Sequence, residues 1–156
     1  MPGQLKSVSS KTKVKLGSKK IAIVVAEWND AITESLFEGA VAGLITGGIK
    51  KKNIVRMNVP GSFELTLGAQ RAAQQKDVAA VICLGCVIQG DTPHFDYICQ
   101  AVAYGITEVN LKFNKPVIFG VLTTLNQKQA LERAGGKLGN KGEEAADTVL
   151  KMLALP

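Results

Sequence analysis

The chain has 156 residues, of which 46% are apolar and 21% charged, and a formal net charge of +6. That length is enough for one domain with a substantial core. Six of the nineteen basic residues are lysines within residues 1–20, which hold no acid, so the remaining chain carries thirteen basic and thirteen acidic residues. Such a neutral body argues against a nucleic-acid-binding surface on the domain and confines any such role to the arm.

The amino-terminal arm, residues 1–18, is rich in lysine, serine and glycine and precedes a single domain over residues 19–156. It lacks the apolar core of a signal peptide, and no apolar run in the chain reaches membrane-spanning length, so we expect a soluble cytoplasmic protein that binds no membrane. A mitochondrial or plastid address is the alternative, because the arm is basic and free of acids. Residues 8–16 alternate mildly in hydropathy, so the arm is either mobile or an extra edge strand.

The body of the chain alternates between strand and helix patterns. Four apolar segments are expected to be strands, namely residues 21–26, 53–59, 79–84 and 116–122. Apolar residues recur at helical spacing in five segments, which begin near Ile32, Ser62, His94, Asn126 and Ala145. This alternation predicts an α/β protein, a three-layer α/β/α sandwich around a mostly parallel four-stranded sheet. The glycine-rich residues 135–142 are expected to be a loop.

The segment from Ala79 to Tyr97 is the most informative in the chain. Its six apolar residues from Ala79 to Leu84 predict a strand covered on both faces. Thr92 and Pro93 then predict a helix start, with threonine as N-cap and proline in the first turn. The only histidine, His94, follows. A glycine loop that enters a helix at the carboxyl edge of a sheet binds small anions, and an imidazole there can transfer protons.

Two further loops fall at the carboxyl ends of expected strands, and one of them holds Trp28, the only tryptophan. In an open parallel sheet such loops form the ligand crevice. Trp28 is either a packing residue or a platform for a flat heterocycle. Glu64, in a first helical turn, either compensates the helix dipole or accepts hydrogen bonds from sugar-like hydroxyls. Arg133 and Lys141 flank the glycine-rich segment and are either solvated or hold a phosphate.

Three cysteines, Cys83, Cys86 and Cys99, lie in apolar surroundings, and their odd number suits a reducing compartment. Cys83 and Cys86 form a C-x-x-C pair, but a redox pair belongs at a helix N-terminus, whereas Cys83 lies inside the expected strand. A zinc site would have only His94 and Cys99 to complete it. We therefore expect three small buried hydrophobic residues and no metal site.

Several motifs, read together and in order, resemble the 6,7-dimethyl-8-ribityllumazine synthase family. They are Trp-Asn at 28–29, Pro-Gly-Ser-Phe-Glu at 60–64, Val-Ile-Gln-Gly-Asp-Thr-Pro-His-Phe-Asp-Tyr at 87–97, Phe-Gly-Val-Leu-Thr at 119–123, Glu-Arg-Ala-Gly-Gly-Lys at 132–137 and Gly-Asn-Lys-Gly-Glu-Glu-Ala-Ala at 139–146. The resemblance implies a flavodoxin-like fold and a transferase of riboflavin biosynthesis. This enzyme would condense 5-amino-6-(D-ribitylamino)uracil with 3,4-dihydroxy-2-butanone 4-phosphate to 6,7-dimethyl-8-ribityllumazine, phosphate and water, without a cofactor.

The resemblance also implies a role for each matching residue. Trp28 would stack on the pyrimidine ring, and His94 would transfer protons. The other contacts to the ribitylaminouracil would come from Asn29, Ser62, Phe63, Glu64, Cys86, Val87, Ile88 and, from the adjacent subunit, Phe119. The phosphate of the second substrate would be held by the backbone amides of Asp91 and Thr92, by Arg133 from across the interface and by Lys141.

The resemblance further implies a homo-oligomer, a pentamer or a multiple of pentamers such as an icosahedral shell, with riboflavin synthase as an open question among its partners. Gln89 stands where the family commonly has arginine or lysine, and Asp91 places a carboxylate beside the anion site. The rival interpretation is a binding or shell protein on the same scaffold without catalysis, and a plain flavin carrier or receiver is a weaker one. His94, Arg133 and the loop at Asp91 together favour the enzyme, because a ring-binding module needs no phosphate site.

Overall fold

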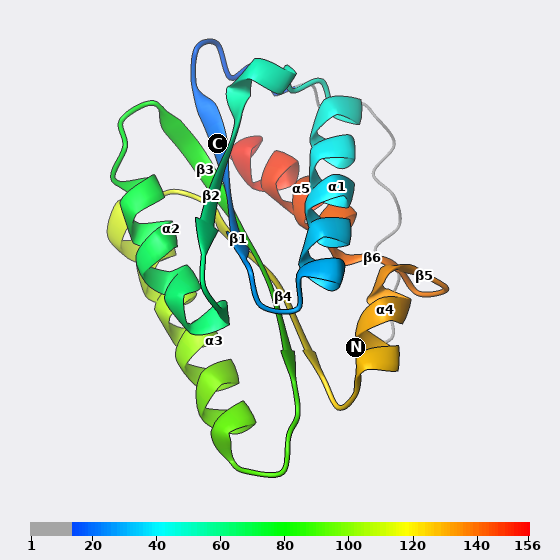
Figure 1. The fold of residues 1–156 in the computed structure, drawn as a ribbon. Helices are drawn as coiled ribbons and strands as arrows, with labels where there is room; N and C mark the ends of the chain where they lie inside the picture. Colours follow the sequence, from blue (N-terminus) through cyan, green and yellow to red (C-terminus); the bar gives the residue numbers. More distant parts are fainter. Residues whose placement is uncertain (1–13) are drawn as a thin grey trace.

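The computed structural model describes residues 14–156 (Figure 1). Its main sheet has four parallel strands in the order β2-β1-β3-β4. The strands are β1 (Lys20–Ala26), β2 (Ile54–Val59), β3 (Val78–Ile88) and β4 (Val117–Thr124). The helices are α1 (Asp30–Thr46), α2 (Leu65–Ala73), α3 (His94–Phe113), α4 (Gln127–Arg133) and α5 (Lys141–Leu153). Two single 3₁₀ turns, η1 (Lys51–Asn53) and η2 (Ser62–Glu64), and a hairpin of β5 (Ala134–Gly136) and β6 (Gly139–Asn140) complete it.

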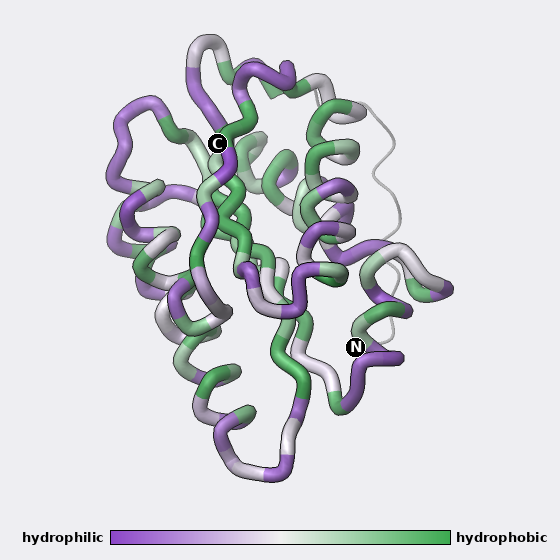
Figure 2. The backbone as a smooth tube through the Cα atoms, viewed as in Figure 1, coloured by the Kyte–Doolittle hydropathy of each residue, from purple (hydrophilic) through white to green (hydrophobic). Residues whose placement is uncertain are grey.

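The sheet lies between two helical layers, with α1 and α5 on one face and α2 and α3 on the other (Figure 1). Apolar residues run along the strands in the middle of the molecule, and polar residues lie in the surrounding helices and in the connecting loops (Figure 2). Each face of the sheet buries its own core, because successive strand side chains point to opposite faces. Ile21, Ile23 and Val25 pack toward α1 and α5, whereas Ala22 and Val24 pack toward α2 and α3. The predicted three-layer α/β/α sandwich is confirmed.

The central strands β1 and β3 form the rigid middle of the sheet. Every residue of β1 from Ile21 to Ala26 is buried, as expected for a strand covered on both faces. The chain leaves β1 toward β2 on one side and later crosses to β3 on the other side. This reversal makes the gap between the carboxyl ends of β1 and β3 the topological switch point, where ligands bind in open α/β sheets.

Two expected boundaries are wrong. The strand expected to end at Leu84 continues to Ile88, because β4 pairs with it as far as Thr124, opposite Ile88. The expected loop over residues 135–142 contains instead the β5–β6 hairpin and the start of α5. Gly135, at the irregular position within β5, and Gly139, the first residue of β6, have φ of 102° and 85°, a conformation that glycine adopts without strain.

The expected edge strand over residues 8–16 falls mostly on residues 1–13, outside the described residues. The last part, Val14 to Leu16, is not a strand. None of the helices within residues 14–156 combines the length and apolarity that crossing a bilayer requires.

Candidate active site

Three connections leave the carboxyl edge of the sheet, after β1, β2 and β3, and the one after β3 extends farthest beyond the sheet (Figure 1). They are residues 27–29, residues 60–64 and residues 89–93. The first two are joined through the carbonyl of Pro60, which accepts hydrogen bonds from the amides of Glu27 at 3.1 Å and Trp28 at 3.0 Å. The edge therefore presents residues of both loops as one connected surface at the switch point.

Trp28 lies on this surface with its side chain 67% exposed. Of the two interpretations of Trp28, a buried packing residue is therefore wrong for the single chain. The six-membered ring of the indole lies close to Gly61, where an added Cβ would be 2.6 Å from Cε3 and 2.9 Å from Cζ3. The ring thus has a fixed neighbour on one side and remains mostly exposed, which leaves surface for a flat ligand to stack on.

Asn29 connects the loop after β1 to the end of β3. Its Nδ2 donates a hydrogen bond to the carbonyl oxygen of Cys86 at 3.0 Å. Its backbone is left-handed, with φ of 61° and ψ of 46°, a conformation that asparagine tolerates better than most residues. The side-chain nitrogen of Asn29 therefore has a structural partner within the chain.

The residues Ser62, Phe63 and Glu64 form η2, a 3₁₀ turn that precedes α2 rather than the first turn of the α-helix itself. Ser62 is buried, with its Oγ against the backbone of Gly85, where a Cβ would be only 2.6 Å away. Phe63 is 57% exposed beside the loop. Glu64 is half-buried, and its Oε2 accepts a hydrogen bond from the amide of Gly61 at 3.0 Å.

Cys86, Val87 and Ile88 are the last three residues of β3 rather than part of a loop. Cys86 is buried, and burial raises the pKa of its thiol to about 11, so the thiol is neutral and unreactive near pH 7. Burial likewise raises the pKa of Cys83 to about 12. All three cysteines are free thiols. Cys86 therefore has only its backbone to offer a ligand.

The connection from Gln89 to Pro93 is exposed, and so is His94, the first residue of α3. Pro93 already has helical dihedrals, φ −65° and ψ −1°, and Thr92 Oγ1 accepts a hydrogen bond from the His94 amide at 3.4 Å. The amides of Asp91 and Thr92 donate to no acceptor among residues 14–156. Free amides at the start of a 20-residue helix form a site suited to an anion.

Arg133 and Lys141 are brought together by the hairpin, because Ala134 pairs with Asn140. Arg133 Nη1 donates to the carbonyl of Gln129 at 2.9 Å within its own helix, and no carboxylate within residues 14–156 pairs with it. Lys141 Nζ forms a salt bridge with Glu144 Oε2 at 2.5 Å. The arginine thus keeps most of its donors for a ligand, whereas the lysine would share its charge with a glutamate.

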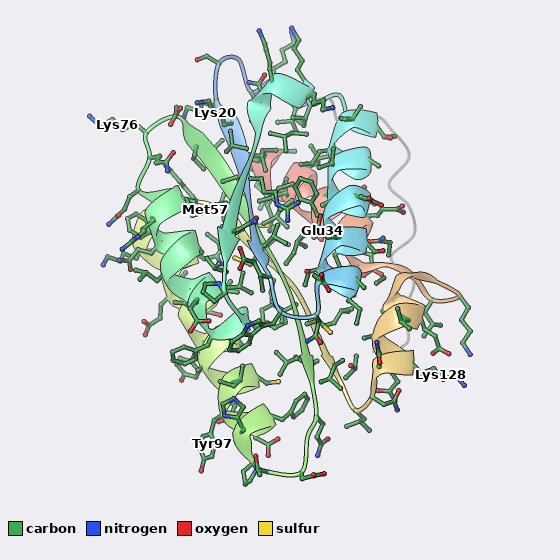
Figure 3. All side chains as sticks on the ribbon, viewed as in Figure 1. Lys20, Glu34, Met57, Lys76, Tyr97 and Lys128 are labelled. Carbon is green, nitrogen blue, oxygen red and sulfur yellow. The ribbon has the colours of Figure 1, made fainter. Side chains whose placement is uncertain are left out.

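These two cations do not meet His94 within one chain. Ala130 and Ala134, in and just after α4, belong to the core beneath α1 and α5, whereas α3 covers the opposite face of the sheet. Tyr97 near the start of α3 and Lys128 near the start of α4 lie on opposite sides of the sheet (Figure 3). A single chain therefore separates the predicted proton-transfer residue from the predicted phosphate-binding arginine.

Phe119 is also separated from Trp28. It lies within the edge strand β4 with 39% of its surface exposed, on the face of Val117 and Val121. It precedes the end of β4 at Thr124 by five residues, which is about 17 Å of strand. The predicted site residues therefore do not meet within one chain. One group lies at the switch point, Phe119 lies in β4 on the side of α2 and α3, and Arg133 and Lys141 lie by the hairpin on the side of α1 and α5.

Sequence reasoning missed Gly61 and Gly85 as parts of this surface. Gly61 lies beneath the indole and Gly85 beneath Ser62, both at distances that exclude a side chain. The available signal was the glycines themselves, one inside the Pro-Gly-Ser-Phe-Glu motif and the other directly after the apolar run of residues 79–84. No cluster of three or more potential metal ligands occurs in the part of the chain that the structure describes.

The strand order and the ligand loops at the switch point define a flavodoxin-like α/β protein. The family model described as 6,7-dimethyl-8-ribityllumazine synthase matches residues 18–156. A protein of Cytophaga hutchinsonii with the same description is 70% identical over 139 residues, 89% of this chain and 87% of its own. Proteins of that description from Parabacteroides distasonis and Coxiella burnetii are 59% and 46% identical, covering 85% and 88% of this chain and 83% and 91% of theirs. The chain belongs to the 6,7-dimethyl-8-ribityllumazine synthase family.

Proposed function

We propose that this chain condenses 5-amino-6-(D-ribitylamino)uracil with 3,4-dihydroxy-2-butanone 4-phosphate, at a site shared by two adjacent subunits. The observation that carries the proposal is the exposed indole of Trp28 at the switch point, beside Glu64, in a chain whose family performs this reaction. The two substrates correspond to two different regions of the surface, one flat and partly apolar and the other rich in free amides.

The ribitylaminouracil lies on the first region. Its pyrimidine ring stacks on Trp28, with Phe63 as a second exposed aromatic residue nearby. The ring edge and the ribityl chain extend along Asn29, Ser62 and Glu64, toward the ends of β3 at Cys86, Val87 and Ile88. Glu64 supports this arrangement because only its Oε2 has a partner within the described chain, which leaves Oε1 able to accept from hydroxyl groups.

The butanone phosphate lies at the start of α3. The amides of Asp91 and Thr92 donate to the phosphate oxygens, and the helix dipole adds favourable electrostatics. The Asp91 carboxylate is exposed, so it can turn toward solvent rather than toward the anion. Gln89 supplies no positive charge, so Arg133 of the neighbouring subunit, assisted by Lys141, is the main cationic contact.

We place the reacting atoms beside His94, which is the first residue of α3 and follows the proposed phosphate-binding amides. The amine must attack the ketone and lose water to form an imine, after which phosphate leaves and a second ring closes, and each step moves a proton. Holding both reactants adjacent contributes most of the acceleration, which is worth roughly 7–11 kcal/mol in favourable intramolecular cases. Proton transfer by His94 adds a smaller factor, on the order of 10²–10⁴.

An exposed apolar stripe on α3 supports a homo-oligomer. Tyr97, Tyr104 and Leu111 are 72%, 75% and 80% exposed, and their spacing of seven residues places them along one side of the helix. Such a stripe is costly in water and marks an interaction surface. We propose that copies of this chain associate through it as a pentamer, which is the unit of any larger shell, and that neighbours then supply Phe119 and Arg133 to each other.

The rival function, a binding or shell protein without catalysis, is less well supported. It accounts for Trp28 and Glu64, but not for the proposed phosphate-binding amides at the start of α3 and the arginine, which have no protein acceptor and no carboxylate partner, respectively, within residues 14–156. Three free thiols fit the reducing cytoplasm, where we place the protein. Riboflavin synthase, which would use the product, remains a proposed partner only.

The direct test mixes the two substrates with the protein and follows lumazine fluorescence. Proximity catalysis predicts a rate that is proportional to protein and far above the spontaneous reaction. A protein that binds the ribitylaminouracil and leaves the spontaneous rate unchanged would support the rival function.

A further inference from the structure

Gly61 and Trp28 are in closer contact than any side chain at position 61 allows. A Cβ added to Gly61 would lie 2.6 Å from Cε3 and 2.9 Å from Cζ3 of the indole, well inside van der Waals contact. Both atoms belong to the six-membered ring, which is rigid, so the whole indole would have to rotate away. The ring can lie where it does only because residue 61 has no side chain.

The backbone at position 61 does not itself require glycine. Its φ of −136° and ψ of −179° are those of an extended chain, which alanine adopts readily. Gly61 also has no positive φ. The need for glycine therefore arises from the contact with Trp28 and from the Glu64 carboxylate, whose Oε2 would be 3.2 Å from the added Cβ.

Glu64 fixes the peptide that the indole rests on. Its Oε2 accepts the Gly61 amide hydrogen at 3.0 Å, which is one half of a capping box at the start of η2. On the other side, the Trp28 amide donates to Pro60, so backbone hydrogen bonds hold both partners of the contact. The peptide can therefore not easily shift to make room for a larger residue.

We propose that Gly61 is the positioning residue for Trp28, and that Glu64 holds Gly61 in place to do this. The absent side chain sets the plane of the indole, and that plane sets where a flat substrate ring stacks. The first step, the placement of the indole by Gly61, does not depend on the function proposed above. The second step, the stacking of a substrate ring on that indole, rests on it.

Gly61→Ala tests both steps, because Trp28 is the only tryptophan and its fluorescence reports the indole directly. In the protein without substrate, the emission maximum should shift and quenching by acrylamide should change. The KM for the ribitylaminouracil should rise about 2- to 12-fold, the range of an aromatic stacking contact, with the KM for the butanone phosphate unchanged.

Trp28→Phe provides the matched control, because phenylalanine has no atom at the Cζ3 position. Adding Gly61→Ala to Trp28→Phe should then change the KM for the ribitylaminouracil less than twofold. If Gly61→Ala alone does not fold, recovery of the fold in the double variant would support the same contact. Equal effects of Gly61→Ala in both backgrounds would overturn the proposal.

Two Glu64 variants test the holding contact. Glu64→Gln keeps an oxygen that can accept the Gly61 amide hydrogen, whereas Glu64→Ala removes it. Only Glu64→Ala should reproduce the emission shift of Gly61→Ala. Unchanged emission in Gly61→Ala would overturn the positioning role. A shifted emission with unchanged KM would instead overturn stacking on Trp28 and leave the placement of the indole by Gly61 supported.

Discussion

Asn29 Nδ2 donates a hydrogen bond to the carbonyl oxygen of Cys86 at 3.0 Å, and this contact joins the loop after β1 to the end of β3. The two strands are adjacent in the sheet, but beyond their ends the backbones diverge toward α1 and α3. The bond spans this gap next to Trp28. It therefore fixes the first loop of the site relative to the strand along which we place the substrate.

Two replacements of Asn29 distinguish the contribution of this hydrogen bond to stability from the contribution of the left-handed backbone. Asn29→Ala loses the bond and strains φ, whereas Asn29→Gly loses the bond but accepts the positive φ. We expect both to lower the unfolding free energy, Asn29→Gly by about 1 kcal/mol and Asn29→Ala by about 1 kcal/mol more. Urea denaturation measures this difference. Equal stability of Asn29→Gly and the parent protein would show that the bond contributes nothing.

Arg133→Ala should raise the KM for the butanone phosphate far more than the KM for the ribitylaminouracil. Loss of a charge-assisted pair of hydrogen bonds is worth about 1.5–3 kcal/mol, or roughly 10- to 150-fold in KM. Arg133→Lys keeps the charge but loses the planar fork, so an intermediate KM is expected. Steady-state kinetics with each substrate varied in turn give both constants. Equal changes in the two constants would place Arg133 away from the phosphate.

His94→Ala should lower kcat and leave both KM values nearly unchanged. Because placement contributes most of the acceleration, the variant should remain clearly faster than the reaction without protein. Single-turnover measurements isolate the chemical step. A rate equal to that of the parent protein would show that His94 has no role in the chemical step. A rate equal to that of the reaction without protein would show that proton transfer contributes more than proximity.

Alkaline pH should destabilise the fold through its buried thiols. Burial raises the pKa of Cys86 from 9.0 to about 11, so the unfolded chain loses this proton first. The stabilising contribution is complete below pH 9 and is lost as the pH rises toward 11. Urea unfolding of the parent protein and of Cys86→Ala at pH 8 and pH 10.5 gives the decrease in unfolding free energy of each protein between the two pH values. The decrease should be larger for the parent protein. An equal decrease would show that other groups cause the effect.

Much of the fold follows from local patterns. Two-sided apolar runs predicted β1 and the core of β3, and helical spacing of Val102, Ile106 and Val109 predicted the buried side of α3. The full extent of β3 could not be predicted, because Gly85 is typical of a loop and only the pairing with β4 extends the strand to Ile88. The β5–β6 hairpin depends similarly on a pairing between Ala134 and Asn140 that no local signal specifies.

The site was predicted less completely than the fold. The motifs indicated Trp28, Glu64 and His94, whose loops the sheet does bring to one edge. They did not indicate that Glu64 binds the Gly61 amide or that Asn29 binds Cys86, because these contacts depend on the three-dimensional approach of loops. The separation of Arg133 from His94 likewise appears only once each helix is assigned to a face of the sheet.

The central claim is that one subunit supplies His94 and its neighbour supplies Arg133, and mixed oligomers test it most directly. Chains with His94→Ala and chains with Arg133→Ala, carrying different affinity tags, are coexpressed and purified over both tags. If the site lies between subunits of a ring, about a quarter of the sites in a random mixture combine an intact His94 with an intact Arg133. The mixed protein should then be more active than either single variant alone, with an activity that approaches a quarter of that of the unmodified protein. Activity no higher than the mean of the two variants would contradict a shared site.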